Sequence, residues 1–436
     1  MAKQSGQSET ALSRREVVKT AGALAAVGAV GTDWSALAGT SLAAPRVVGA
    51  NDRIRIGLIG PGGQGTAHLR NLVAMIKDKQ INAEIVAISE IYEPRKARAK
   101  ALTGAQIYHD YRKMLAEAKL DACWITTPEH WHAQMALDAM DAGCDLYVEK
   151  PLTRYLDEAN KLYKKAKEKK AVIQMGAQAC SDEIWHRAHE VIAAGEIGRP
   201  VWSQTSYCRN SKGGEWNYGI DAGASPDNLD WKAWLGPAPK IPFNKDRYFR
   251  WRKYWDYSSG ITSDLFPHRI SPLFIAMGLD YPTRVVCTGG IYVQYDREVP
   301  DTTHLVADFD SGHTMVVAGS TCNEYGLNDM IRGNKMNMLL GANITLQPER
   351  TWADDVEGRS ISVAPRREDL RKMERNFLDC VRSRQKPYCH IDLAHKVMVT
   401  IALSEISYRE NRVVGFDGEK MKMVRGATPT PSPPKV

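Results

Sequence analysis

Hydrophobic and polar residues alternate along residues 51–176 in blocks that predict strands and helices in turn. Short apolar runs, typical of buried strands, lie at 54–59, 84–88, 122–126, 145–148 and 172–175. Longer segments with helical spacing of apolar residues lie between and after them, at 66–76, 94–102, 111–118, 131–142 and 156–169. Regular alternation of strand and helix predicts an α/β fold with a doubly wound parallel sheet.

The pattern changes after Gly176, where a second domain is expected to begin. One helix is predicted at 183–194, followed by segments of alternating polarity at 200–206, 284–293, 304–308 and 314–319. Such segments predict a mostly antiparallel sheet. Two late helices are predicted at 367–384 and 393–411, so the second domain is also of the α/β class.

The first 44 residues have the pattern of an export signal rather than of a folded domain. Arg14 and Arg15 precede a weakly apolar stretch at 21–30, and small residues at 36–43 offer cleavage sites. This order is typical of a twin-arginine signal, which predicts a periplasmic or extracellular protein. The alternative is a disordered tail with a chance Arg-Arg pair. The apolar stretch is shorter than the ~20 residues of a membrane span, so no span is expected.

The expected domains are therefore a signal peptide at 1–44, a nucleotide-binding domain at 45–176, a second domain at 177–426, and a proline-rich tail at 427–436. The 436 residues carry a net charge of +7 with both signs interspersed, which argues against nucleic-acid binding and leaves an anionic substrate open. The eight cysteines lie far apart without metal-type spacing, so no metal site is predicted. Buried thiols are favoured, while one or two disulfides stay open.

A glycine-rich turn follows the first predicted strand. Gly60-x-Gly62-x-x-Gly65 lies between this strand and a predicted helix, which is the context of a dinucleotide-binding turn. Gly60 would form the tight turn, Gly62 would let a pyrophosphate approach, and Gly65 would pack helix against strand. Gly63 and Gln64 belong to the same turn and are expected beside the cofactor. An ordinary glycine-rich turn is the alternative.

Glu90 ends the second predicted strand, where an acid accepts hydrogen bonds from the ribose hydroxyls of NAD and repels the 2′-phosphate of NADP. NAD is therefore the expected cofactor. Arg95 and Lys96 lie nearby and leave NADP open.

Two motifs follow the next strands, at 126–132 (TTPEHWH) and at 147–152 (YVEKPL). Both are expected at carboxyl ends of parallel strands, where ligands bind. Lys150 would be partly desolvated and able to relay a proton to a substrate hydroxyl, although this motif taken alone would favour a structural pair with Glu149. Asp264 and His268, four residues apart, would share one helix face, and the carboxylate would then orient the imidazole.

These motifs, in this order, resemble the Gfo/Idh/MocA oxidoreductase family, and within it the glucose–fructose oxidoreductase type. The resemblance implies a Rossmann domain, a second α/β domain with a large, mostly antiparallel open sheet, and a homodimer or homotetramer. It implies nicotinamide-dependent chemistry on sugars, inositols and related polyols. It also implies Lys150 as the proton relay, His268 as the acid or base and Asp264 as its partner. Thr127, Pro128, His132 and Glu149 would line the cofactor, with Gln178 beside the nicotinamide or the substrate.

Aromatic and basic residues gather between residues 202 and 255, where six of the eleven tryptophans lie. Aromatic faces pack against sugar rings, and arginines bind hydroxyls or carboxylates. We expect Arg209, Trp216, Arg252 and Tyr254 to bind substrate, and Trp231 and Trp234 to lie in the core.

Export of a dehydrogenase predicts a cofactor that stays bound and is regenerated in place. Paired oxidation and reduction of two substrates is the favoured scheme. Redox-neutral epimerisation or glycoside cleavage through a keto sugar is an alternative, as is a non-catalytic sugar-binding protein. The intact Glu149-Lys150-Pro151 motif favours net oxidoreduction.

Overall fold

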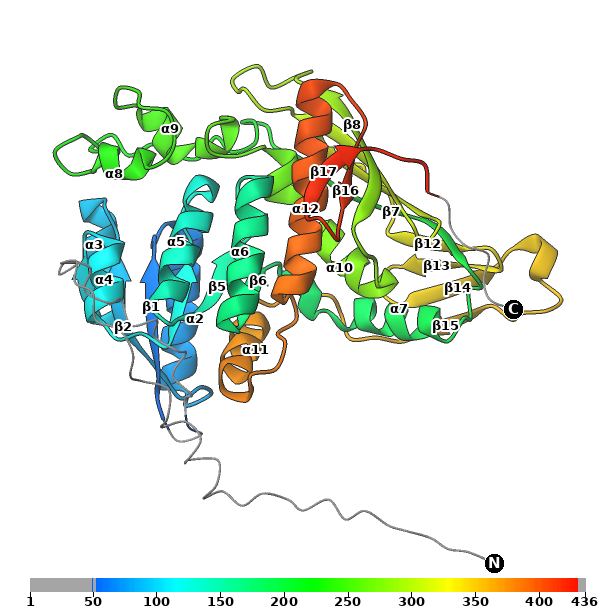
Figure 1. Ribbon diagram of the computed structural model, residues 1–436, viewed down its shortest axis with the longest axis horizontal. Helices are drawn as coiled ribbons and strands as arrows, with labels where there is room; N and C mark the ends of the chain where they lie inside the picture. Colours follow the sequence, from blue (N-terminus) through cyan, green and yellow to red (C-terminus); the bar gives the residue numbers. More distant parts are fainter. Residues whose placement is uncertain (1–48, 50–51, 430–436) are drawn as a thin grey trace, which may run out of the picture. The chain divides into compact units, whose positions relative to one another are not determined.

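The structure is a computed structural model that describes Gly49 and residues 52–429. The expected signal peptide at 1–44 therefore lies outside the described residues, as do residues 430–436 of the expected tail. The described part has two α/β domains, which the ribbon in Figure 1 shows side by side.

The first domain contains, in the described residues, a six-stranded parallel sheet with the order β3-β2-β1-β4-β5-β6. Its strands are β1 (Ile54–Ile59), β2 (Ala83–Ser89), β3 (Gln106–Tyr108), β4 (Ala122–Ile125), β5 (Asp145–Glu149) and β6 (Ile173–Gly176). Its helices are α2 (Gly63–Lys77), α3 (Glu93–Thr103), α4 (Tyr111–Glu117), α5 (Glu129–Asp141) and α6 (Leu156–Lys169). The doubly wound sheet is confirmed, and the strand order reverses between β1 and β4, where such sheets bind ligands.

Helix α6 shows how local sequence sets an element. The Glu158 carboxylate accepts the Tyr155 N–H at 3.0 Å and satisfies a donor that the first turn leaves free. Ala159, Leu162 and Ala166 recur at helical spacing and are buried against the domain. The predicted and observed bounds of this helix coincide because cap and periodicity agree.

The second domain contains a mixed sheet of eleven strands in the described part of the chain. Its strands are β7 (Pro200–Asn210), β8 (Pro282–Gly290), β9 (Thr302–Phe309), β10 (His313–Ser320), β11 (Cys322–Asn323), β12 (Met330–Gly333), β13 (Met336–Leu340), β14 (Ile344–Pro348), β15 (Arg359–Ile361), β16 (Val414–Asp417) and β17 (Lys422–Arg425). Strands β7 and β10 are parallel, and the other pairs are antiparallel, as expected. The predicted strand at 284–293 was too long, because residues beyond Gly290 form a loop.

Two late helices join the domains. Outside residues 211–257, the helical elements described after β6 are η1 (Gln178–Ser181), α7 (Glu183–Ala193), η3 (Ile261–Leu265), α10 (Pro267–Met277), η4 (Arg350–Trp352), α11 (Leu370–Ser383) and α12 (Ile391–Glu410). Helix α12 packs against both α6 and β8, and Figure 1 shows it between the two sheets. Arg154 is fully buried and forms a two-pronged ion pair with Glu405 at 2.5 and 3.0 Å, which fixes α12 to the first domain.

Residues 211–257, which we call the strap, leave β7 and cross to the first domain before returning at η3. The strap carries α8 (Trp231–Leu235), α9 (Lys245–Phe249) and η2 (Trp251–Lys253), and Figure 1 shows α8 and α9 above α3, α4 and α5. Tyr92 of the first domain and Leu229 of the strap form a β-bridge. Trp231 and Trp234 pack in the strap's own apolar cluster, as predicted.

In residues 52–429, no helix combines the length and apolar character that a membrane crossing requires. All eight cysteines lie within the described residues and are unpaired.

Candidate active site

A cavity of about 1080 Å³ lies between the carboxyl ends of the first sheet, the strap and the start of α10. It has two ends. At the lysine end the walls are formed by Lys150, Arg209, Arg252, Asp264 and His268. At the strap end they are formed by Glu90, Tyr92, Arg95, Trp234, Tyr248 and Phe249. The glycine turn opens into the cavity between the two ends.

The glycine turn has the geometry of an anion site. Gly60 has a φ of +85°, and a Cβ there would lie 2.7 Å from Thr127 Cγ2. A Cβ on Gly65 would lie 2.5 Å from the Gly60 carbonyl oxygen, so Gly65 packs the helix on the turn and does not face the cavity. Gly62 caps α2 without any side-chain acceptor, which leaves the first N–H groups of the helix available for a phosphate. These residues fit a dinucleotide.

Glu90 lies at the rim of the strap end. Its Oε1 accepts the backbone N–H groups of Ile91 at 2.7 Å and Tyr92 at 3.0 Å, which fixes the carboxylate after β2. Arg95 donates to the Tyr248 hydroxyl at 2.9 Å, and its guanidinium lies 5.0 Å from the centre of that ring. The strap thus fixes Arg95, which the sequence had suggested as a residue that could bind the 2′-phosphate of NADP.

Lys150 directly follows β5, and its side chain is only 12% exposed. Its Nζ donates to the Asp264 carbonyl at 2.7 Å and to Asp264 Oδ1 at 2.5 Å. The same carboxylate accepts Arg252 Nε at 2.8 Å. Burial alone would raise the pKa of Asp264, but the charges of Arg252 and Lys150 hold it well below its usual range. Asp264 therefore stays ionised and fixes the lysine.

The expected pairing of Asp264 with His268 differs from what the structure shows. The chain forms a π-helical turn at η3 and starts α10 only at Pro267, so the two residues do not share one regular α-helix. No hydrogen bond joins them among the described residues, and His268 Nδ1 is buried without a partner. Burial, then the nearby Lys150 charge, lowers the pKa of His268 to about 3. The imidazole is therefore neutral at physiological pH.

Glu149 lines the cavity and belongs to a buried ionic chain. Its Oε1 accepts Gln64 Nε2 at 3.1 Å and lies 2.8 Å from His68 Nε2, while His68 Nδ1 lies 2.6 Å from Glu374 Oε1. Burial would lower the pKa of His68, but hydrogen bonds to the two carboxylates raise it to about 9. A protonated His68 therefore links the glycine-turn helix, the end of β5 and α11. Sequence reasoning missed it, because Glu374 is 306 residues away.

The other predicted residues separate into two groups. Thr127, Pro128 and Gln178 line the cavity, as do Gly60, Gly62, Gly63, Gln64, Glu90 and Glu149. His132 lies behind the wall, where its ring contacts the carbonyls of Thr127 at 2.8 Å and Pro151 at 2.7 Å. It holds the two motif loops together and does not line the cofactor cavity.

Of the four predicted substrate residues, Arg209 and Arg252 line the cavity. Trp216 is buried behind them and donates from Nε1 to Asp264 Oδ2 at 2.9 Å. Tyr254 does not line the cavity, because its hydroxyl donates to Asp246 and its ring lies under Arg247. The prediction for Tyr254 is therefore not supported, and Trp216 positions Asp264 instead of reaching a substrate directly.

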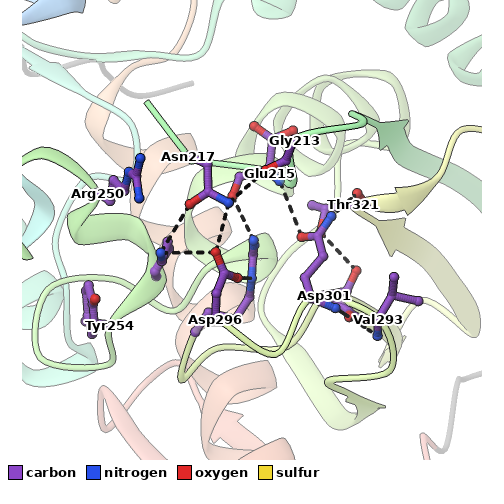
Figure 2. Close-up of polar contacts among 12 residues, drawn as sticks. Gly213, Glu215, Asn217, Arg250, Tyr254, Val293, Asp296, Asp301 and Thr321 are labelled. Carbon is purple, nitrogen blue, oxygen red and sulfur yellow. Dashed lines mark hydrogen bonds and ion pairs between the residues drawn. The ribbon is translucent and has the colours of Figure 1, made fainter. Parts of the chain in front are cut away.

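A polar cluster supports the strap where it leaves β7, as Figure 2 shows. Lys253 is 3% exposed and donates to Asn217 Oδ1 and Asp296 Oδ2, each at 3.2 Å. Arg297 donates to the Glu215 carbonyl at 2.8 Å and covers the Trp216 ring.

The loop that supplies this support is itself fixed by one carboxylate. Asp301 Oδ2 accepts the backbone N–H groups of Tyr292, Val293 and Gln294 at 2.7–2.9 Å (Figure 2). Gln294 Nε2 in turn donates to the Thr321 carbonyl at 2.7 Å. The loop after β8 therefore holds Trp216 rigidly, and Trp216 holds Asp264.

Comparisons with known proteins agree with this architecture. A model described as an oxidoreductase family with an NAD-binding Rossmann fold matches residues 54–177, and its C-terminal alpha/beta domain matches residues 190–429. The scyllo-inositol 2-dehydrogenase (NAD+) of Bacillus subtilis is 24% identical over 378 residues, covering 84% of this chain and 97% of that protein. An inositol 2-dehydrogenase of Burkholderia vietnamiensis is 31% identical over 166 residues, covering 37% and 48%.

Solved structures share the fold. The WlbA dehydrogenase of Bordetella pertussis, in complex with NADH and UDP-GlcNAcA, superimposes with a TM-score of 0.62 at 17% identity, covering 84% of this chain and 99% of that one. Levoglucosan dehydrogenase, in complex with NADH and levoglucosan, gives a TM-score of 0.62 at 18% identity, covering 86% and 100%.

Proposed function

The chain belongs to the Gfo/Idh/MocA oxidoreductase family, and on that premise we propose that it transfers a hydride between NAD and a hydroxyl-bearing carbon of a sugar, an inositol or a related polyol. One observation carries the proposal: Lys150, Asp264 and His268 meet in the same cavity into which the glycine turn opens. The relatives named as inositol 2-dehydrogenases support the substrate class.

The residues of the cavity fit NAD along its length. The uncapped start of α2 suits the pyrophosphate, and Glu90 at the rim suits a ribose with free hydroxyls. When bound, NAD accepts the hydride from the alcohol or returns it to the ketone. The protein must then bind the substrate, exclude water and move the hydroxyl proton.

The protonation states assign these tasks. A neutral His268 is able to accept the proton of a substrate hydroxyl, because one of its two ring nitrogens carries a free lone pair. The Lys150 ammonium, fixed by Asp264, donates a hydrogen bond to the same oxygen and stabilises the negative charge that develops there. In the reverse direction the protonated His268 would return the proton to that oxygen, and Lys150 would keep its hydrogen bond to it. Asp264 orients Lys150 and so acts as a positioning residue.

The strap supports a cofactor that dissociates slowly. It is bonded to the first domain beside Glu90 through Glu93 N–H to the Asn228 carbonyl at 2.9 Å and through Trp131 Nε1 to the Trp234 carbonyl at 2.8 Å. Gly236 packs directly on Trp131, where a Cβ would lie 2.1 Å from the ring. The adenosine half of NAD would lie beneath this cover and leave only after the strap opens.

A retained cofactor also suits a second function, in which one substrate is oxidised and then reduced again, as in epimerisation.

We further propose that residues 1–44 direct export by the twin-arginine route and that the protein is a homodimer or homotetramer. Replacing Arg14 and Arg15 by lysine should leave the protein in the cytoplasm, and light scattering should give at least twice the monomer mass.

The test of the proposed function begins with protein purified without added cofactor. After dialysis and denaturation, mass spectrometry should find close to one NAD(H) per chain. Addition of inositols and sugars to the native protein should then change the absorbance of the bound nicotinamide. A protein that holds no nucleotide and reduces none on addition of NAD and polyols would contradict the proposal.

A further inference from the structure

The lysine end of the cavity carries more positive than negative charge. Three cations line it, namely Lys150, Arg209 and Arg252. Two carboxylates pair with them: Asp264 contacts Lys150 and Arg252 and lies 3.9 Å from Arg209, and Glu215 lies 2.9 Å from Arg209. A third carboxylate, Glu149, also lines the cavity, but its Oε1 is paired with His68. One positive charge of the lysine end is therefore left without a carboxylate of its own, among side chains whose partial burial strengthens electrostatic interactions.

The two arginines also keep donors that the described residues do not satisfy. Arg252 uses Nε on Asp264, and its guanidinium lies 4.1 Å from the centre of the Trp251 ring, while no hydrogen bond of its two terminal nitrogens is recorded within residues 52–429. Arg209 is held by Glu215 through Nη2, and its Nε is buried without a partner. The buried Nε of Arg209 is a donor of the kind that a ligand or ordered water normally satisfies, and the terminal nitrogens of Arg252, whose side chain is 23% exposed, are open to the same ligand.

We propose that the substrate is a sugar acid, such as a uronate or an aldonate, whose carboxylate binds between Arg209 and Arg252. This inference rests on the proposed function, since it places the reacting hydroxyl at Lys150 and His268. A carboxylate carries the single negative charge that the lysine end lacks, and its two oxygens match the forked donors of a guanidinium. A neutral polyol would satisfy the hydrogen-bond donors of the two arginines but would leave the excess positive charge of the lysine end uncompensated. A dianionic phosphate would turn the net charge of the lysine end from positive to negative.

Calorimetry on the protein loaded with NADH tests the carboxylate directly. The probes are D-glucuronate and D-gluconate, with D-glucose as the neutral counterpart and glucose 6-phosphate as the dianion. We expect at least one of the acids to bind about tenfold to hundredfold more tightly than glucose, the range for a charge-assisted bond to a buried arginine. Equal binding of acids and glucose, or tightest binding of the phosphate, would overturn the inference.

Arg252→Gln should remove the preference for the acid. The readout is the ratio of acid to neutral affinity, because any disturbance of Asp264 in this variant falls on both ligands and cancels. The preference should fall about tenfold or more and reappear in part in Arg252→Lys. Arg187→Gln, at an exposed arginine paired with Glu190 on α7, is the matched control and should keep the wild-type ratio. An unchanged ratio in Arg252→Gln would contradict the assignment.

Turnover separates this inference from the proposed function. With the acid as substrate, Arg252→Gln should raise KM more than it lowers kcat, since a carboxylate contact serves binding in both ground and transition states. If neutral polyols reduce the cofactor and acids bind no better, the enzyme assignment stands and the carboxylate site is wrong. If the acid binds through Arg252 but no ligand changes the nicotinamide, the carboxylate site stands and the dehydrogenase function is wrong.

Discussion

The lysine end and the strap end of the cavity differ in what holds them. At the lysine end, charges fix one another, because Asp264 accepts from Lys150 and Arg252 in a nearly dry environment. At the strap end, aromatic rings and backbone hydrogen bonds fix a chain segment that comes from the other domain, with Trp234 stacked on Trp231 at 4.7 Å between ring centres. The first end is suited to moving a proton, the second to retaining a ligand.

Chemistry and retention are therefore separable in the same cavity. A change at the lysine end should alter turnover and leave cofactor content intact. A change at the strap end should alter cofactor release and leave the chemistry of the bound cofactor intact.

Lys150→Met should have the largest effect. Turnover should fall by about 10³-fold or more, because the variant removes both the donor to the developing negative oxygen and the partner of Asp264. Steady-state kinetics measure the loss, and nucleotide content by mass spectrometry should stay near that of the wild type. Lys161→Met, at an exposed lysine on α6, is the control. Wild-type turnover in Lys150→Met would refute the role assigned to this residue.

His68→Gln should destabilise the protein in a pH-dependent manner. Since folding raises the pKa of His68 from 6.5 to about 9, its stabilising effect is fully present below pH 6.5 and is lost as the pH rises through 9. The free energy of unfolding, measured by urea denaturation, should be on the order of 3 kcal/mol lower in the variant at pH 6. The difference in the free energy of unfolding between wild type and variant should become smaller toward pH 9.5.

The control is His304→Gln, at an exposed histidine of β9, whose free energy of unfolding should equal that of the wild type at both pH values. A gap for His68→Gln that stays constant between pH 6 and 9.5 would mean that His68 acts by packing alone. Because His68 joins α2 to α11, its loss should also weaken the support beneath Glu149.

The sequence predicted the lysine end better than the strap end, for a physical reason. The glycine turn and Lys150 are each encoded in a short segment that directly follows one strand, β1 or β5, at the edge of the sheet where ligands bind. Asp264 was found by the same kind of local motif, although its true partners, Lys150 and Arg252, are set by a π-helical turn that no periodicity indicates. His132 was expected to line the cofactor, whereas its ring contacts the carbonyls of Thr127 and Pro151, because a motif position does not reveal which side of a wall a ring occupies.

In the sequence, the strap was visible only as a segment rich in tryptophans. Its path over the first domain depends on contacts such as Tyr92 with Leu229, which are separated by more than a hundred residues. The strands after β10 were missed because each has only two to five residues, too few for a period of two to stand out from the sequence around it.

Trp234→Ala should loosen the strap and leave the lysine end unchanged. The Trp234 ring is 4% exposed and packs against Tyr257 and Tyr248, so its loss removes contacts that hold the strap together. Dissociation of NADH, followed by its fluorescence on dilution, should accelerate by about thirtyfold, the equivalent of about 2 kcal/mol. Turnover at saturating NAD should change less than the release rate.

Trp352→Ala, in η4 of the second domain, is the matched aromatic control. Equal release rates in wild type and Trp234→Ala would show that the strap does not retain the cofactor.

Glu90→Gln should have the smallest effect and should sharpen the assignment of the strap end. The carboxylate of Glu90 is fixed by the N–H groups of Ile91 and Tyr92, so the amide keeps the shape and removes the charge. Affinity for NAD should fall by about tenfold, the value of one charge-assisted hydrogen bond, and affinity for NADP should rise because the repulsion of its 2′-phosphate is gone. Titration of nucleotide-free protein with both cofactors gives the ratio. If NADP binds wild type as tightly as NAD, Glu90 does not select the cofactor, and Arg95 leaves Tyr248 to bind the phosphate.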